Sequence, residues 1–271
     1  MLHYKIAALL LACCSLSSTR AQELFVYTEP ASNMPAKTMG IRMSNWIMQD
    51  DYANRVNYHL IPEVMWGANK RLMLHAEGYF SDRTGSLSAE GGALYAKYRF
   101  FSTDKVNRHF RMAALARATS NNGDIHQEEI ATNGHNTGFQ LGLIGTQLLH
   151  KTAISGTVYY EHATDNRKGR ELPIGYDGNA VNYSLSAGRL ILPRSYKGYK
   201  QTNLNVMVEL LGQSLSDNGK QYLDIAPSIQ LIFNSQTRLD VGYKRELYSS
   251  MLRTAPNGLL IRIEHLLYHV L

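Results

Sequence analysis

The sequence predicts an all-β protein, a single transmembrane antiparallel β-barrel of about 12 strands. Three observations lead to this fold. Apolar and polar residues alternate with a period of two, in segments of about ten residues that recur to the end of the chain. The connections between these segments are short and long in turn, and aromatic residues gather near both ends of the apolar face. No apolar run reaches the ~18 residues of a membrane-spanning helix.

The stretch Arg71–Phe100 shows the alternation most clearly. Between Leu72 and Phe80 the even-numbered residues are apolar or small, whereas His75 and Glu77 are odd-numbered. This period is that of an extended strand with two different faces. A charge facing lipid at the bilayer midplane would cost ~2–4 kcal/mol, so the charged face must line the lumen.

Residues 1–21 are typical of a signal peptide. Lys5 supplies a positive charge, Ile6–Cys13 an apolar core, and the small residue Ala21 precedes the expected cut. A second interpretation is lipoprotein processing at Cys13, because the residues before it resemble a lipobox. Cys13 and Cys14 are the only cysteines, so after the first cut the mature chain can form neither a disulfide nor a thiolate metal site.

Gln22–Lys37 contains two prolines and no sustained period. We expect it to form a periplasmic arm, either tucked into the mouth of the barrel or leading into it without order. Residues 38–271 then form the barrel as one domain.

Twelve alternating segments follow the arm, and each is expected to be a strand. They are Thr38–Met48, Asn57–Gly67, Leu72–Phe80, Gly91–Phe100, Phe110–Thr119, Thr137–Leu149, Thr152–Ala163, Ala180–Ile191, Thr202–Leu211, Tyr222–Phe233, Thr237–Leu247 and Gly258–Val270.

The lengths of the connections give the barrel an orientation. Tight ones follow even strands (Ala68–Lys70, His150–Lys151, Ser235–Gln236), and the longest follow odd strands (Ser120–Asn136, Thr164–Asn179). Barrels of the Gram-negative outer membrane have short periplasmic turns and long outer loops. We therefore expect an outer-membrane protein with both termini in the periplasm. Its partners would be the outer-membrane lipid, the barrel-assembly machinery and a small-molecule solute.

Aromatic residues on the apolar face form two expected girdles. Those near the periplasmic ends are Trp66, Tyr98, Phe100, Phe110 and Phe233, and those near the outer ends are Tyr58, Phe139, Tyr160, Tyr183 and Tyr243. Pro62 and Pro227 lie within strands, and because proline cannot donate to a ladder we expect a bulge or local break at each.

The inward face carries equal numbers of acidic and basic residues. The bases are Arg42, Lys97, Arg99, Arg111, Arg117, Arg238, Lys244 and Arg262, and the acids are Glu63, Glu77, Glu161, Glu209, Asp224, Asp240, Glu246 and Glu264. Paired charges could fill the interior as a polar plug, or leave a continuous channel. We expect Lys97, Arg99, Arg111 and Arg117 to form a positive strip that attracts an anionic or polarisable solute, with Glu77 and His75 beside it. The wall formed by the last four strands should be net acidic.

Two runs resemble a known family. Ile61–Gly67 followed by Leu72–His75, and the alternation Ala93–Phe100, are similar to outer-membrane transporters grouped as the MetA pathway of phenol degradation, which are related in shape to long-chain fatty-acid channels. The arm also resembles that of barrels from Bacteroidetes-type bacteria. The resemblance implies passage of small hydrophobic or aromatic compounds, and no catalytic residues.

Two other functions stay open. His162 and Thr164, with Asn179, resemble the His-x-Ser pair and Asn of outer-membrane phospholipase A, but a threonine replaces the serine nucleophile. Ten methionines, several near the first strand, suit Cu(I). We expect no enzyme, no cofactor and no metal. Without a basic run or a phosphate-binding loop, nucleic acid is not expected as a partner either.

Overall fold

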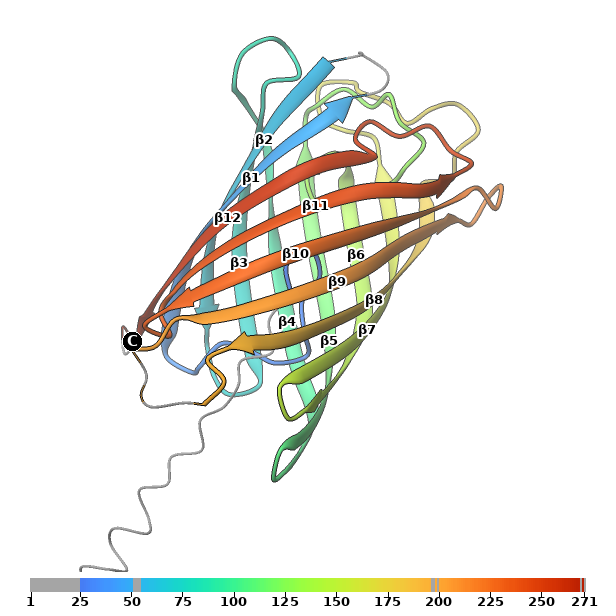
Figure 1. The fold of residues 1–271 in the computed structure, drawn as a ribbon. Helices are drawn as coiled ribbons and strands as arrows, with labels where there is room; N and C mark the ends of the chain where they lie inside the picture. Colours follow the sequence, from blue (N-terminus) through green and yellow to red (C-terminus); the bar gives the residue numbers. More distant parts are fainter. Residues whose placement is uncertain (1–24, 51–54, 196–197, 199, 269, 271) are drawn as a thin grey trace, which may run out of the picture.

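The computed structural model describes residues 25–50, 55–195, 198, 200–268 and 270. They form a closed antiparallel barrel of twelve strands, in which each strand pairs with its sequence neighbours and β1 pairs with β12 (Figure 1). The expected fold class is confirmed. No helix long and apolar enough to cross a membrane occurs among these residues. The expected signal peptide, with Cys13 and Cys14, lies outside them.

All twelve expected strands are present. They are β1 (Thr38–Asp50), β2 (Arg55–Gly67), β3 (Leu72–Ser81), β4 (Ser88–Lys105), β5 (Arg108–Asn121), β6 (Thr137–Leu149), β7 (Thr152–Thr164), β8 (Asn179–Leu192), β9 (Asn203–Leu215), β10 (Gln221–Phe233), β11 (Thr237–Ser249) and β12 (Asn257–Tyr268).

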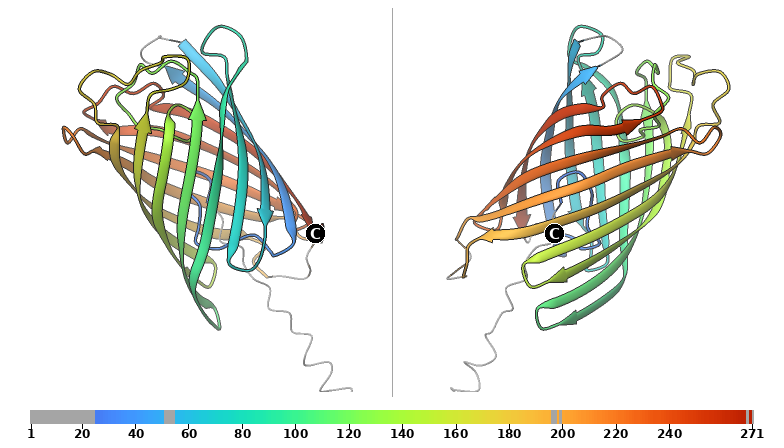
Figure 2. Two further views of the ribbon diagram at one scale, coloured as in Figure 1. Left: turned by 180° about the vertical axis from the view of Figure 1, so that it is seen from behind. Right: turned by 45° about the vertical axis from the view of Figure 1, so that its right-hand side comes forward.

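The β4–β5 hairpin is longer than the alternation indicated. Its pairing continues past Phe100 to Lys105, which pairs with Arg108, and the hairpin projects beyond its neighbours (Figures 1 and 2). Polar residues there suggested a loop. A tight turn with Asn107 in the left-handed region (φ 59°) instead lets the two strands stay paired to their tips.

The two ends of the barrel differ. One end, here called the turn end, carries the connections after even-numbered strands, which are short except for residues 193–202. The other, the loop end, carries the connections after odd-numbered strands, including residues 122–136 and 165–178. The arm and the C-terminal end of β12 both lie at the turn end (Figure 1).

The two faces of each strand differ as expected. In β4, the outward Leu94 is 68% exposed, whereas the inward Lys97 is fully buried. The aromatic residues of both expected girdles lie on the outward face, and nine of the ten are at least 36% exposed: Trp66, Tyr98, Phe100, Phe110, Phe233, Phe139, Tyr160, Tyr183 and Tyr243. The tenth, Tyr58, is half-buried because its hydroxyl donates to Asn45.

Both prolines interrupt the ladder on one side, as expected. Pro62 keeps its pairing with β1, but between Leu60 and Glu63 no residue of β2 pairs with β3. Pro227 keeps its pairing with β9, whereas neither it nor Ala226 pairs with β11. The first gap matters for function, because it lies beside the cavity described below.

Candidate functional site: the closed lumen

The described part of the arm, residues 25–37, lies inside the barrel at the turn end (Figures 1 and 2). Phe25 and Val26 are buried with Met207 and Leu260 of the wall. Further along, the arm contributes Ala31 to a second buried cluster. Of the two arrangements expected for the arm, the structure has the one tucked into the barrel.

Glu209 of β9 anchors the start of the arm. Its carboxylate accepts hydrogen bonds from three consecutive backbone amides, those of Val26 (2.9 Å), Tyr27 (2.8 Å) and Thr28 (2.9 Å). The Thr28 hydroxyl adds a fourth bond of 2.6 Å. Successive amides around one anion form a nest, a common way for a backbone to hold negative charge.

Glu29 anchors the middle of the arm by charge. Its oxygens lie 3.1 Å from Arg42 Nη1 and 2.9 Å from Lys97 Nζ, and Lys97 also donates to the Pro30 carbonyl at 2.8 Å. Burial raises the pKa of Glu29, but the charges on Lys97 and Arg42 outweigh it and hold that pKa well below its usual range. The strand alternation did not place Glu29 in the lumen, because Glu29 belongs to no strand.

The other members of the expected positive strip also have partners. Arg111 Nη1 donates to Ser32 of the arm at 2.7 Å, and Arg99 Nη2 donates to the Lys70 carbonyl at 2.7 Å. Arg117 forms an ion pair with Glu77.

The four bases of the strip are not contiguous. Leu115 is the residue paired with Lys97, and Tyr95 is paired with Arg117. The expectation of a strip of close, unpaired charges differs from the structure here, because the arm and Glu77 supply counter-charges. Contact of these residues with a solute stays a prediction.

Residues 122–136 fold into the lumen at the loop end. The backbone of Ile130 exchanges two hydrogen bonds with the Gln213 amide, of 2.9 and 2.7 Å. Thr132 donates twice to Glu161 Oε1, from its amide and its hydroxyl, both at 2.7 Å. This segment therefore covers the mouth of the barrel at the loop end.

Arg253, from the β11–β12 loop, ties this segment to the wall. It donates to both oxygens of Asp224 at 2.6 and 2.7 Å, and lies 3.1 Å from Glu129 of the segment. Burial raises the pKa of Glu129, but Arg253 and Lys244 outweigh it and lower that pKa. The last four strands were expected to form a net acidic wall. Arg253, which the strand pattern could not place, neutralises part of it.

A cavity of about 130 Å³ lies inside the barrel, and residues of the 122–136 segment line it together with the wall. Its five aromatic lining residues come from four strands: Trp46, Tyr79, Phe80, Tyr159 and Tyr222. Its polar lining includes His59, Gln127, Glu129, His135, Glu161, Asn182 and Lys244. None of the four strip residues lines it.

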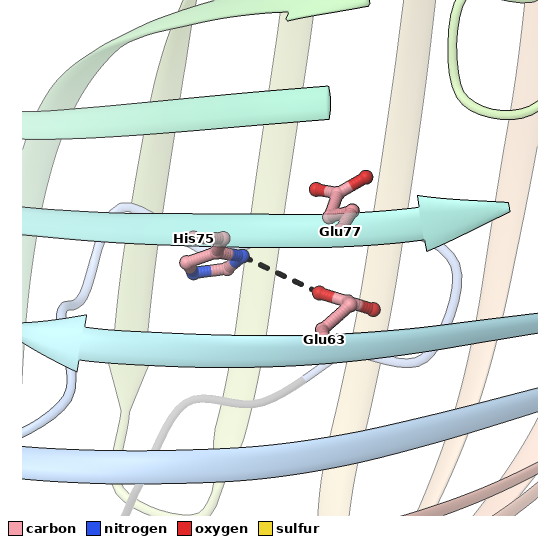
Figure 3. A group of neighbouring side chains, drawn as sticks. All are labelled: Glu63, His75 and Glu77. Atoms are coloured by element: carbon pink, nitrogen blue, oxygen red, sulfur yellow. Dashed lines mark ion pairs between the residues drawn. The ribbon is translucent and has the colours of Figure 1, made fainter. Parts of the chain in front are cut away.

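Glu63, His75 and Glu77 come together from β2 and β3 (Figure 3). One ligand atom of each lies within 4.8 Å of the others, and His75 Nδ1 is 3.4 Å from Glu63 Oε2. The donor types suit a divalent cation. Both carboxylates are already paired with arginines, however: Glu63 with Arg42 at 3.3 Å and Glu77 with Arg117. Two guanidinium charges would repel a metal ion, so the cluster fits its arginines better.

The structure also places the residues that suggested lipid hydrolysis or Cu(I) binding. His162 Nδ1 lies 2.7 Å from Asn179 Oδ1, as an orienting pair would. No hydrogen bond joins His162 to Thr164 within the described chain, and threonine remains the wrong nucleophile. Of the methionines near the first strand, Met43 faces outward, 44% exposed, and Met48 faces the cavity. These two thioethers point to opposite sides of the wall.

Comparison with known proteins identifies the fold. No family model and no curated protein matches the chain. Among solved structures, the COG4313 outer membrane channel from Pseudomonas putida F1 is similar over 90% of this chain and 100% of its own, with 12% sequence identity and a TM-score of 0.55. OprD of Pseudomonas aeruginosa is less similar in structure, with a TM-score of 0.38 at 8% identity over 90% of this chain and 99% of its own. The chain therefore has the fold of an outer-membrane channel.

Proposed function

We propose that the protein is an outer-membrane channel for small hydrophobic or aromatic solutes, closed here at both ends. The observation that carries this is the aromatic-lined cavity of about 130 Å³ inside the barrel, to which the 122–136 segment contributes seven lining residues. The arm and residues 122–136 can leave the lumen without breaking a ladder pair, so opening needs no change in the barrel.

The size of the cavity indicates the size of the solute. An apolar protein cavity of ~150 Å³ holds one benzene molecule. A cavity of about 130 Å³ with five aromatic residues therefore suits a single ring with few substituents. This agrees with the solutes that the resemblance to the phenol-degradation transporters implies, and membership of that family stays a prediction.

The gap in the β2–β3 ladder offers an apolar solute a route to the bilayer. Ile61, inside the gap, and Phe80, which ends it on β3, both line the cavity. A side chain added at Gly78 would meet only the Phe80 ring (3.3 Å) and the Pro62 ring (3.5 Å). Two apolar rings thus separate the cavity from the lipid at a place where no hydrogen-bonded pair must break.

The positive strip fits this proposal in the open state. Lys97 and Arg111 contact the arm, through Glu29 and Ser32. When the arm leaves, both bases face water, and a preference for anions at the turn end is expected there. Reversing Lys97 to Glu would also repel Glu29, and so release the arm.

Position in the membrane follows from the same account. The turn end, with both termini, faces the periplasm, the outward face contacts outer-membrane lipid, and the barrel-assembly machinery inserts the chain. A catalytic role is not proposed, since within the described residues no hydrogen bond joins His162 to Thr164, which stands at the nucleophile position.

Reconstitution tests the channel. The full mature chain and a chain that begins at residue 35 are compared in planar bilayers and in liposome swelling with a neutral monocyclic solute. We expect rare, small conductance steps from the full chain, and frequent larger ones with faster swelling from the shortened chain. If neither chain conducts or admits solute, the interior is a permanent polar plug and the proposal fails.

A further inference from the structure

Glu161 of β7 is a buried acid without an ionic partner. It is 1% exposed and lines the cavity. Oε1 accepts three hydrogen bonds, two from Thr132 at 2.7 Å and one from Gln140 at 3.0 Å, whereas Oε2 accepts only one, from Asn182 at 2.7 Å. All these donors are neutral. Among the described residues, no Lys, Arg or His nitrogen lies within 4.0 Å of a carboxylate oxygen of Glu161, the distance expected of an ion pair.

The other acids and bases near the cavity are paired with one another. Arg253 binds Asp224 and Glu129 and lies 3.0 Å from Glu246, and Lys244 Nζ lies 3.7 Å from Asp224. Two bases thus face three acids. Glu161 stands outside this set of five, so no base of the set is left over to pair with it.

The two histidines do not offset this charge. Burial, then the charge of Arg83 and the nearby His59, hold the pKa of His135 well below its usual range. His135 Nδ1 lies 3.0 Å from Arg83 Nη1 and, facing a permanent cation, accepts its hydrogen bond. The His59 ring lies beside the His135 ring, with the centroids 5.0 Å apart and the ring planes tilted by 47°. A second positive charge there would face Arg83.

We propose that the cavity is a binding site for a small organic cation with a single ring, whose ammonium group donates to Oε2 of Glu161. An unpaired buried carboxylate is costly, and a cation beside it removes that cost. The faces of Trp46, Tyr79 and Tyr159 attract positive charge as well. The inference rests on the proposed function, since a ligand reaches the cavity only past one of the closing segments or the β2–β3 gap.

Other solute charges fit the cavity less well. A carboxylate would meet the charge of Glu161 in a site of low polarity. A neutral ring would gain the apolar contacts but leave Glu161 uncompensated. Gln127 Nε2, which is buried without a partner in the described chain, offers the bound cation a second polar contact to an oxygen substituent.

Tryptophan fluorescence can test this directly. Of the two tryptophans, Trp46 lines the cavity and Trp66 faces outward, 39% exposed. In a Trp66→Phe background, the protein in detergent micelles is titrated near neutral pH with benzylamine, benzyl alcohol and benzoate, which differ mainly in charge. We expect saturable quenching with benzylamine at a concentration at least about tenfold below that for benzyl alcohol, and none with benzoate.

Four variants separate charge from structure. Glu161→Gln should abolish the preference for benzylamine, and Glu161→Asp should keep it. Lys244→Met should keep or tighten benzylamine binding, since it removes a competing cation. Glu171→Gln, which removes the same charge from an exposed loop position, should change nothing. Heat-modifiable gel mobility shows whether each barrel is folded.

Opposite results would overturn the inference. These are tighter binding of benzoate, equal binding of benzylamine and benzyl alcohol, or an unchanged preference in folded Glu161→Gln. Binding in micelles does not require passage through the barrel. If the shortened chain conducts while benzylamine shows no preference, only this inference fails. If benzylamine binds but no chain conducts, the channel fails.

Discussion

Glu209→Ala should release the arm. The substitution removes the acceptor of three backbone amides, of which that of Val26 belongs to a fully buried residue. A buried donor left without a partner costs ~1–3 kcal/mol. Loss of the Val26 hydrogen bond alone should thus destabilise the docked arm by ~1–3 kcal/mol, and loss of all three by ~3–9 kcal/mol. When the arm leaves, water satisfies these donors, so the whole cost acts on the docking equilibrium.

A loss of ~3 kcal/mol raises the undocked fraction by about a hundredfold, since each ~1.4 kcal/mol is a factor of ten. Single-channel recording measures this as the fraction of time spent in the larger conductance state. Glu209→Gln, which keeps one carbonyl acceptor, should give a smaller increase. Glu171→Ala, on an exposed loop, should give none.

The reasoning would be refuted by a folded Glu209→Ala protein whose openings match wild type while the chain that begins at residue 35 opens frequently. The arm would then be held by Glu29 and its neighbours alone. Equal, low conductance in all three proteins would mean that the arm is not a gate.

Three further predictions concern other contacts. Lys97 holds the pKa of half-buried Glu29 below its ordinary value of 4.5. The ion pair therefore contributes fully above that pH and is lost as pH falls through the lower docked-state pKa. Conductance should stay flat from about pH 8 to about pH 5 and rise only in stronger acid. Arg253→Met removes both hydrogen bonds of the Asp224 carboxylate to arginine and leaves it only Lys244, at 3.7 Å; the loss should cost ~1–3 kcal/mol, seen as a lower temperature of heat modification and faster proteolysis of residues 122–136. Pro62→Val restores a ladder donor, so stability should rise by ~0.5–1.5 kcal/mol and uptake of a monocyclic solute should slow; unchanged uptake would argue against the lateral route.

The strands could be predicted because each one faces lipid on one side and the polar lumen on the other. Lipid excludes charge from one face, so the parity of Leu94 and Lys97 in β4 identifies outside and inside without any knowledge of neighbours. Pro62 and Pro227 were located as breaks for an equally local reason, the missing backbone donor.

The closing of the lumen could not be predicted in the same way. The arm and residues 122–136 have no period, and their positions depend on partners distant in sequence, such as Glu209 for the arm and Gln213 for the loop. Arg253 was missed because it lies on a loop, although its guanidinium points into the lumen and binds Asp224 and Glu129 there. Equal numbers of lumen acids and bases did indicate pairing. The sequence could not show that Glu29, outside the strands, takes part.

Reversible locking of the arm tests the central claim, a channel closed by its own N-terminal segment. The hydroxyls of Thr28 and Ser186 lie 2.9 Å apart, so Thr28→Cys with Ser186→Cys should form a disulfide between arm and wall. A chain that begins at Gln22 has no other cysteine. We predict that the oxidised protein shows no large openings in planar bilayers, and that a reductant restores the openings seen with Thr28→Ala/Ser186→Ala. Equal conductance before and after reduction, with the disulfide verified, would contradict the account.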